Sequence, residues 1–108
     1  MEKMTFETMQ EMQRELQEKY KGRWAELSPE KARQQLLWMY GEMGEVGDIM
    51  KKKGNEEIMH NDEVRAHFIE EMCDVMMYFN DVLLCYDIKP EELEKIYLEK
   101  HRRNMGRW

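Results

Sequence analysis

The sequence is poor in the features that mark secreted, membrane-spanning or nucleic-acid-binding proteins. It has only two cysteines and two prolines in 108 residues, and no apolar run approaches the roughly 18 residues of a membrane span. Only residues 1–4 precede the first amphipathic stretch, so we expect no signal peptide. The net charge of −6 argues against a nucleic-acid polymer as partner. We therefore expect a cytoplasmic chain without a membrane partner, in which Cys73 and Cys85 are reduced core thiols.

The composition suits one small globular domain. Hydrophobic residues make up 42% and charged residues 37% of the chain, with no linker, repeat or low-complexity segment, so we expect a single domain over residues 1–108. A domain this short leaves much of its surface in water, and pairing of subunits is therefore expected. Methionine is abundant, with 12 residues, and we expect these flexible thioethers to fill an irregular core.

Apolar residues recur at helical spacing along nearly the whole chain, and no stretch alternates for long enough to predict a strand. The pattern predicts helices over residues 5–20, 28–53, 63–86 and 90–103. Gly54 is expected to end the second helix, and the polar segment 55–62 is predicted to be a loop. The expected fold class is therefore all-α with four helices.

The third predicted helix combines an apolar surface with one acidic stripe. Residues 68–86 are mostly apolar, which predicts a helix surrounded by other helices. The stripe contains Glu70, Glu71, Asp74 and Asp81, with His67 at its start and no lysine or arginine. Like charges at this spacing repel, and carboxylates flanked by apolar packing need a countercharge. A bound cation is the simplest source of that charge.

Glycine is unusually regular in the second predicted helix. Gly41, Gly44 and Gly47 recur every third residue, and each costs roughly 1 kcal/mol relative to alanine in a helix interior. We expect this cost to be offset by the close approach of a neighbouring helix or a ligand.

Two pairs of acids lie on these two helices at a spacing that puts each pair on one face. Glu42 and Glu45 are three residues apart on the second helix, and Glu71 and Asp74 are three apart on the third. Either pair alone is common on helices. If the helices pack side by side the four carboxylates converge into a hard-oxygen site, which suits Mg²⁺ with Mn²⁺ as a substitute.

Other residues have both a structural and a binding interpretation. We expect Trp24 and Trp38 to be core residues, and the alternative is that one of them stacks on a base. Lys52 and its neighbours match the helix dipole, and the alternative is that they reach phosphate. The basic run 100–108 is either a solvated tail or a phosphate-binding segment. The candidate substrate-binding residues are Trp38, Lys52, Lys100, Asn104 and Arg107.

Residues 41–46 (GEMGEV) and 70–75 (EEMCDV) resemble the MazG-like branch of the all-α nucleoside triphosphate pyrophosphohydrolases. The signature of that family is Glu-x-x-Glu followed by Glu-x-x-Asp, and 25 residues separate Glu45 from Glu71 here. The resemblance covers residues 28–107 and includes a closing Lys-x-x-x-Asn-x-x-Arg. Many members carry a further glutamate just before the first motif acid, where this chain has Gly41.

The resemblance implies a four-helix MazG-like bundle completed by oligomerisation into a homodimer or homotetramer. It implies Mg²⁺-dependent hydrolysis of a nucleoside triphosphate to a monophosphate and pyrophosphate. The implied metal ligands are Glu42, Glu45, Glu71 and Asp74, and the implied phosphate contacts are Lys100, Asn104 and Arg107. We take Glu45 as the candidate general base.

Two alternatives stay open. One is a same-fold enzyme with a dUTPase-like or phosphoribosyl-ATP pyrophosphohydrolase-like activity, in which the metal site would look the same. The other is a non-catalytic helical interaction protein that forms oligomers, in which the acidic stripe is solvated and a methionine-rich surface binds the partner.

Overall fold

The computed structural model describes residues 3–107. Met1, Glu2 and Trp108 belong to the predicted domain, and Trp108 also to the basic run 100–108, but all three lie outside the described residues. The elements in chain order are α1 (Phe6–Lys19), the short 3₁₀ helix η1 (Pro29–Lys31), α2 (Ala32–His60), α3 (Asp62–Cys85) and α4 (Pro90–Met105). Residues 3–107 contain no β-strand. The prediction of an all-α fold with four helices is confirmed.

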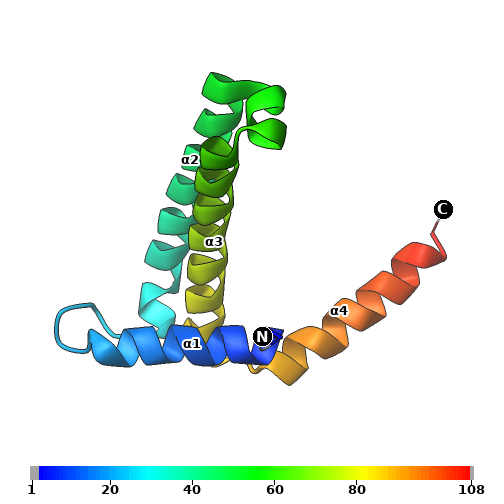
Figure 1. Ribbon diagram of the computed structural model, residues 1–108. Helices are drawn as coiled ribbons and strands as arrows, with labels where there is room; N and C mark the ends of the chain where they lie inside the picture. The colour runs from blue at the N-terminus through cyan, green and yellow to red at the C-terminus, as the bar shows by residue number, and fades with distance from the viewer. Residues whose placement is uncertain (1–2, 108) are drawn as a thin grey trace.

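The centre of the fold is a helical hairpin formed by α2 and α3, which lie side by side along their lengths (Figure 1). Each helix turns an apolar stripe toward the other, and Val46 and Ile49 of α2 are buried in this contact. The hairpin is the element that brings the two predicted acid pairs onto neighbouring helices.

The turn of the hairpin is shorter than the sequence predicts. Gly54 has a φ of 82°, which glycine adopts without the strain of a side chain, and α2 bends there. The prediction of a loop over residues 55–62 is wrong, because the chain resumes helical structure up to His60 and α3 starts at Asp62. The start of α3 is fixed by a local cap: the Asn61 side chain accepts hydrogen bonds from the backbone N–H groups of Glu63 (3.1 Å) and Val64 (3.2 Å).

Helix α1 lies across the end of the hairpin and packs on α3 (Figure 1). Its start is fixed by a reciprocal cap, in which Thr5 and Thr8 exchange side-chain and backbone hydrogen bonds. The buried residues of this helix are Gln10 and Gln13, whereas Met12 is exposed. The face that α1 turns toward α3 is therefore rich in amides.

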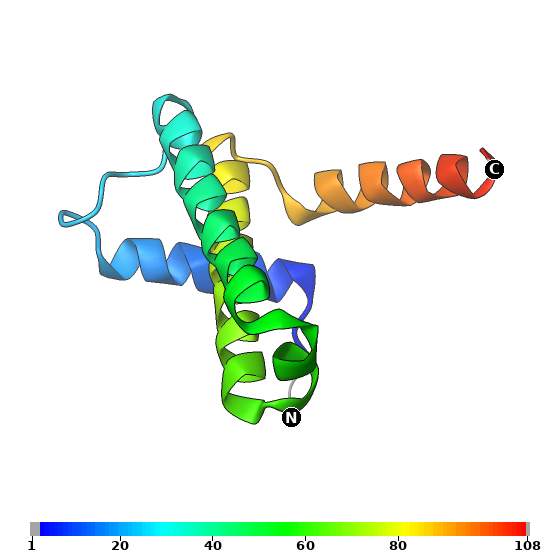
Figure 2. The same cartoon turned by 90° about the horizontal axis from the view of Figure 1, so that it is seen from above.

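Helix α4 leaves the hairpin and projects away from it (Figures 1 and 2). Among the helices of residues 3–107, α4 contacts only α1. Its start follows the predicted pattern, with Pro90 in the first turn and the Lys89 N–H donating to the Glu92 carboxylate at 2.8 Å. Its apolar residues Ile96 and Tyr97 are exposed.

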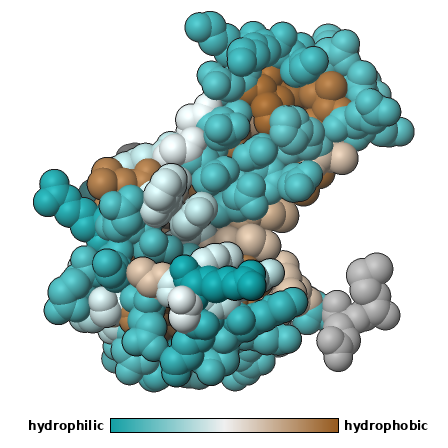
Figure 3. Space-filling view, turned by 90° about the vertical axis from the view of Figure 1, so that its left-hand side faces the viewer, coloured by the Kyte–Doolittle hydropathy of each residue, from teal (hydrophilic) through white to brown (hydrophobic). Residues whose placement is uncertain are grey.

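The protomer leaves much apolar surface uncovered, and this corrects three expectations. Helix α3 is not surrounded by other helices, because only α2 covers it along its length and its opposite face is open. Most methionines of the described chain are exposed instead of filling a core. Cys85 is a buried free thiol as expected, but Cys73 lies on the open face of α3. Figure 3 shows hydrophobic residues, in brown, at the surface of one face of the molecule.

No helix within the described chain combines the length and the apolar character that crossing a membrane requires.

We expect Gly54→Ala to destabilise the protein by about 1 kcal/mol, because alanine is strained at a positive φ. The measurement is urea unfolding of the variant beside Lys53→Ala, whose exposed side chain occupies the preceding helical turn. Lys53→Ala should lie within about 0.5 kcal/mol of the parent. Equal stability of the two variants would contradict the account of the bend.

Candidate metal centre

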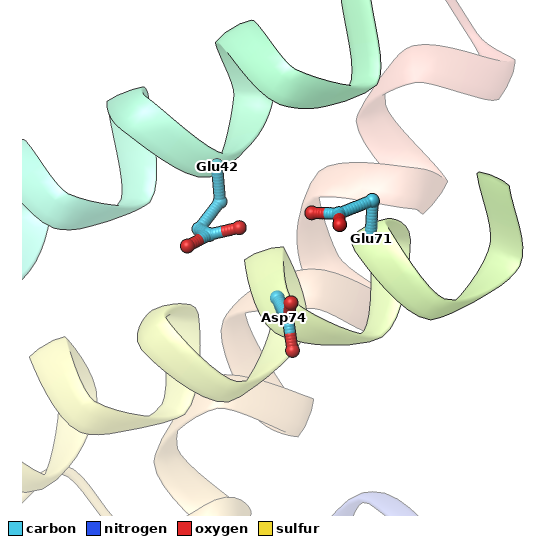
Figure 4. A group of neighbouring side chains, drawn as sticks. All are labelled: Glu42, Glu71 and Asp74. Atoms are coloured by element: carbon cyan, nitrogen blue, oxygen red, sulfur yellow. The ribbon is translucent and has the colours of Figure 1, made fainter. Parts of the chain in front are cut away.

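Three carboxylates converge between α2 and α3. One oxygen from each of Glu42, Glu71 and Asp74 lies within 4.8 Å of the others, and all three side chains are half-buried. Figure 4 shows Glu42 directed from α2 toward the two acids of α3. This group brings together three of the four acids that the sequence predicts to converge.

Helical geometry explains the convergence. Glu71 and Asp74 are three residues apart and therefore share a face of α3. Glu42 lies on the same face of α2 as two buried residues, Val46 one turn further along the helix and Ile49 two turns further along. Because those apolar residues hold α2 against α3, the Glu42 carboxylate is fixed opposite the α3 pair.

The site disfavours the charged forms of its own acids. Burial raises the pKa of Glu42, and a hydrogen bond with Glu71 and the charges of Asp74, Glu71 and Glu45 raise it further. Burial also raises the pKa of Asp74, with smaller effects from the charges of Glu71 and Glu70. Both shifts have the sign expected of carboxylates that are crowded together and partly removed from water.

No side chain in residues 3–106 supplies a full countercharge. Neither lysine nor arginine in that range forms an ion pair with the three carboxylates. Only His67 approaches, with its Nε2 atom 3.4 Å from Glu71 Oε1, and its side chain is largely exposed. The sequence analysis did not pair His67 with Glu71, although their spacing of four residues on one helix could have indicated the contact. The cluster is therefore short of positive charge in a way that a divalent cation would correct.

Glu45 does not join this group. Its side chain is exposed on α2, and the three-carboxylate cluster of the described chain excludes it. The reason is the direction of the buried stripe: at 100° per residue Val46 and Ile49 lie within about 40° of Glu42, whereas Val46 lies about 100° from Glu45. Its charge nevertheless acts on Glu42.

The expected close approach of a neighbouring helix at the spaced glycines is also wrong within the protomer. A β-carbon added at Gly41, Gly44 or Gly47 would meet nothing within 4 Å in the described structure. These glycines line an open face of α2, so neither the α2–α3 contact nor α1 explains them.

Trp24 and Trp38 are not core residues. Trp24 is 42% exposed and Trp38 is 54% exposed. Both line a cavity of about 410 Å³ that Glu42 and Asp74 also line. Trp24 stacks on Tyr20 with ring centroids 4.5 Å apart, which holds its indole at the wall of the cavity.

The predicted phosphate-binding cations lie away from the cluster in the protomer. Lys52 is exposed on α2 and lies ten residues beyond Glu42, or about 15 Å along a helix. Lys100 and Asn104 are on α4, and Arg107 follows the end of that helix. Since α4 contacts only α1 among the described helices, Lys100 and Asn104 do not meet the three carboxylates of their own chain.

The far part of the cavity holds a polar network that the sequence did not reveal. Asp81 is buried, and its carboxylate accepts hydrogen bonds from the side-chain amides of Gln13 (2.8 Å), Gln17 (3.2 Å) and Gln35 (3.0 Å). Burial raises the pKa of Asp81, and these three hydrogen bonds act in the opposite direction. Asp81 thus has amide donors where the acidic stripe suggested a cation. Its donors are 46 to 68 residues away in the sequence, so no local pattern could have predicted them.

Comparison of the chain with protein-family models, with curated proteins and with solved structures finds no match. The resemblance to the MazG-like enzymes therefore depends on the motif residues and their spacing alone.

We expect Glu42→Gln to raise the melting temperature of the metal-free protein at pH 7, because it removes one of three crowded charges. The folded protein raises the pKa of Glu42 and Asp74. Their contribution to stability is therefore retained below the ordinary carboxyl pKa and lost as the pH rises through the raised values. The gain of the variant should be small at pH 4 and larger at pH 7.

The control is Glu70→Gln, because Glu70 is exposed on the same helix and lies outside the cluster. Its effect on the melting temperature should be less than half that of Glu42→Gln. A Glu42→Gln variant that melts below the parent at pH 7 in EDTA would show that the three carboxylates do not repel one another as described.

Proposed function

We propose that the protein is a Mg²⁺-dependent nucleoside triphosphate pyrophosphohydrolase, which releases pyrophosphate and a nucleoside monophosphate. The observation that carries the proposal is the convergence of Glu42, Glu71 and Asp74 beside a cavity of about 410 Å³. The resemblance to the MazG-like motif supplies the reaction. A cytoplasmic location fits the proposal, because reduced thiols such as Cys73 and Cys85 persist there.

The three carboxylates are suitable ligands for Mg²⁺, and Mg²⁺ is a suitable ion for binding a triphosphate. Carboxylate oxygens are the ligands that Mg²⁺ prefers, and Mg²⁺ commonly completes its coordination with waters and substrate phosphates. When bound, the ion would neutralise phosphate charge and make an attacking water more acidic. Charge neutralisation and positioning are the main demands of phosphoryl chemistry, so a cluster of carboxylates with no separate nucleophile is sufficient machinery.

Glu45 is the proposed general base. Its exposed side chain is one turn of α2 from Glu42, close enough for its charge to act on that carboxyl group. A carboxylate outside the ligand group can accept the proton of an attacking water, whereas the three clustered acids are occupied by the ion.

The test is release of pyrophosphate from a panel of canonical and modified nucleoside triphosphates with Mg²⁺. We expect turnover that EDTA abolishes and that Glu71→Ala lowers by at least 100-fold, because the variant loses a ligand. Glu70→Ala, which alters the adjacent exposed acid, should keep the parent rate within about twofold. Turnover that survives both EDTA and Glu71→Ala would exclude the proposal.

The panel also separates the same-fold alternatives. Preference for dUTP would indicate a dUTPase-like enzyme, and preference for phosphoribosyl-ATP would indicate the second alternative. Each would use the same three carboxylates.

A second candidate function has one observation in its favour. The open face of α3 carries exposed apolar residues, among them Ile69, Met72 and Met76, and contiguous apolar surface often marks an interaction site. In a non-catalytic interaction protein this face would bind the partner, and the three carboxylates between α2 and α3 would be solvated and would bind no ion. Absence of pyrophosphate release together with unchanged melting in millimolar Mn²⁺ would favour this function.

The proposed enzyme is a homo-oligomer. The protomer exposes 8966 Å², whereas a compact monomer of 13.3 kDa exposes about 6,400 Å². The excess is about 2,500 Å² per chain, so an interface that buried it on both partners would cover about 5,000 Å² in total, at the upper end of the usual range for obligate interfaces. Two copies that cover one another's open helix faces would account for it.

A second copy also supplies what the site lacks. The basic residues of α4 do not meet the carboxylates of their own chain, and α4 extends away from the hairpin. We propose that α4 of one protomer lies against the α2–α3 hairpin of another in a dimer or tetramer. Lys100, Asn104 and Arg107 would then contact the phosphates of a substrate bound at the partner's acids.

Mixing two inactive variants tests this arrangement. Glu71→Ala removes a carboxylate and Lys100→Ala removes a cation, so each homo-oligomer should lose most of its activity. If the two residues act from different chains, unfolding and refolding the variants together should restore up to about a quarter of the parent rate, the share of sites that are intact in a random dimer. Mixtures that stay as inactive as the separate variants would contradict the arrangement in trans.

A further inference from the structure

The cavity beside the three carboxylates has chemistry that the proposed hydrolysis does not use. Glu42 and Asp74 line one part of it and Asp81 lines another. Asp74 and Asp81 are seven residues apart on α3, or about 10 Å along the helix, which is about the length of a nucleoside. A nucleotide whose phosphates lie at the acids would thus extend its base toward Asp81.

Aromatic side chains form the sides of this cavity. Trp24, Trp38 and Tyr78 line it, and both tryptophans keep substantial exposed area. Flat aromatic faces beside an open cavity suit the stacking of a heterocycle. The alternative that one tryptophan stacks on a base is therefore better supported than a core position for either.

The polar end of the cavity offers acceptors. An ionised carboxylate can only accept hydrogen bonds, so Gln13, Gln17 and Gln35 must each turn an amide N–H toward Asp81. Their carbonyl oxygens consequently point away from that carboxylate. Asp81 Oδ1 accepts from two glutamines but Oδ2 accepts from Gln35 alone, which leaves one acceptor position unfilled within residues 3–107.

We propose that this cavity binds the base of the substrate, and that Asp81 with its three glutamines selects bases that carry an exocyclic amino group. The inference depends on the proposed function for the identity of the ligand as a nucleotide. It goes beyond that function because it names the class of base and the residues that recognise it.

The acceptor-rich end of the cavity distinguishes amino bases from their keto counterparts. The cytosine amino group has one N–H on the C5 side of the ring, which can donate to Asp81 Oδ2 without bringing the ring acceptor N3 near the carboxylate. The N3–H of uracil or thymine lies between two carbonyl oxygens, and an approach to Asp81 would press one of them against the carboxylate or a glutamine oxygen. One such mismatch against a hydrogen-bonding site typically costs tenfold or more in affinity.

The test uses nucleosides, which carry no phosphate and so need neither the ion nor the three carboxylates. The pairs are deoxycytidine with deoxyuridine and deoxyadenosine with deoxyinosine, and each pair differs in an amino or a keto group. Quenching of tryptophan fluorescence in EDTA gives the affinity, since Trp24 and Trp38 line the cavity. We expect at least one amino nucleoside to bind saturably and at least tenfold more tightly than its keto partner.

Two variants locate the selectivity. Asp81→Asn should reduce the preference to threefold or less, because an amide can turn either a donor or an acceptor toward the base. Asp48→Asn alters an exposed acid of α2 that does not line the cavity, and it should keep the parent preference. If Asp81→Asn does not fold, Gln35→Met serves as the second variant, because Gln35 donates to Asp81 from α2. Its preference for the amino nucleoside should be reduced at least threefold.

Three results would overturn the assignment: no saturable quenching by any of the four nucleosides, equal affinities within both pairs, or tighter binding of the keto members. Each can occur while pyrophosphate release persists, in which case only the base assignment fails. Selective nucleoside binding without any pyrophosphate release would instead support the base assignment and remove the hydrolase.

Discussion

The mutual repulsion of three carboxylates between two helices is the constraint on which the rest of the structure depends. Glu42, Glu71 and Asp74 are held together by the apolar contact between α2 and α3, and burial and charge both raise the pKa of Glu42 and Asp74. A protein that only needed stability would gain by replacing these acids with neutral groups. Retaining them costs stability in the metal-free state, and binding of a divalent ion is what would offset that cost.

The open shape of the protomer keeps the basic residues of α4 apart from the acidic cluster. Helix α4 holds the basic residues, yet it extends away from the acidic cluster of its own chain. The outer face of α3 and the glycine-lined face of α2 are likewise uncovered. A second copy placed against the hairpin would cover apolar surface and bring cations to the phosphates at once, so that assembly and completion of the site would be a single event.

Local pattern was enough to predict the helices, because apolar spacing, Gly54 and Pro90 each act within a few residues of the chain. It also predicted that Glu71 and Asp74 share a face of one helix and meet the pair Glu42 and Glu45 of the neighbouring helix, and Glu42 does lie opposite them. It failed for Glu45, because a pair of acids on one helix does not show which member faces the neighbour. It failed for the environment of Asp81, because Gln13 and Gln35 come from distant segments. The segment 55–62 was predicted as a loop because its polarity conceals the cap that Asn61 provides.

The most direct test of the central claim is a titration of Mn²⁺ into the protein, followed by the loss of the electron paramagnetic resonance signal of the free ion. The account predicts saturable binding that Glu71→Gln or Asp74→Asn weakens by at least tenfold and that Glu70→Gln leaves unchanged. Absence of saturable binding at millimolar Mn²⁺, or equal binding by all three variants and the parent, would contradict it.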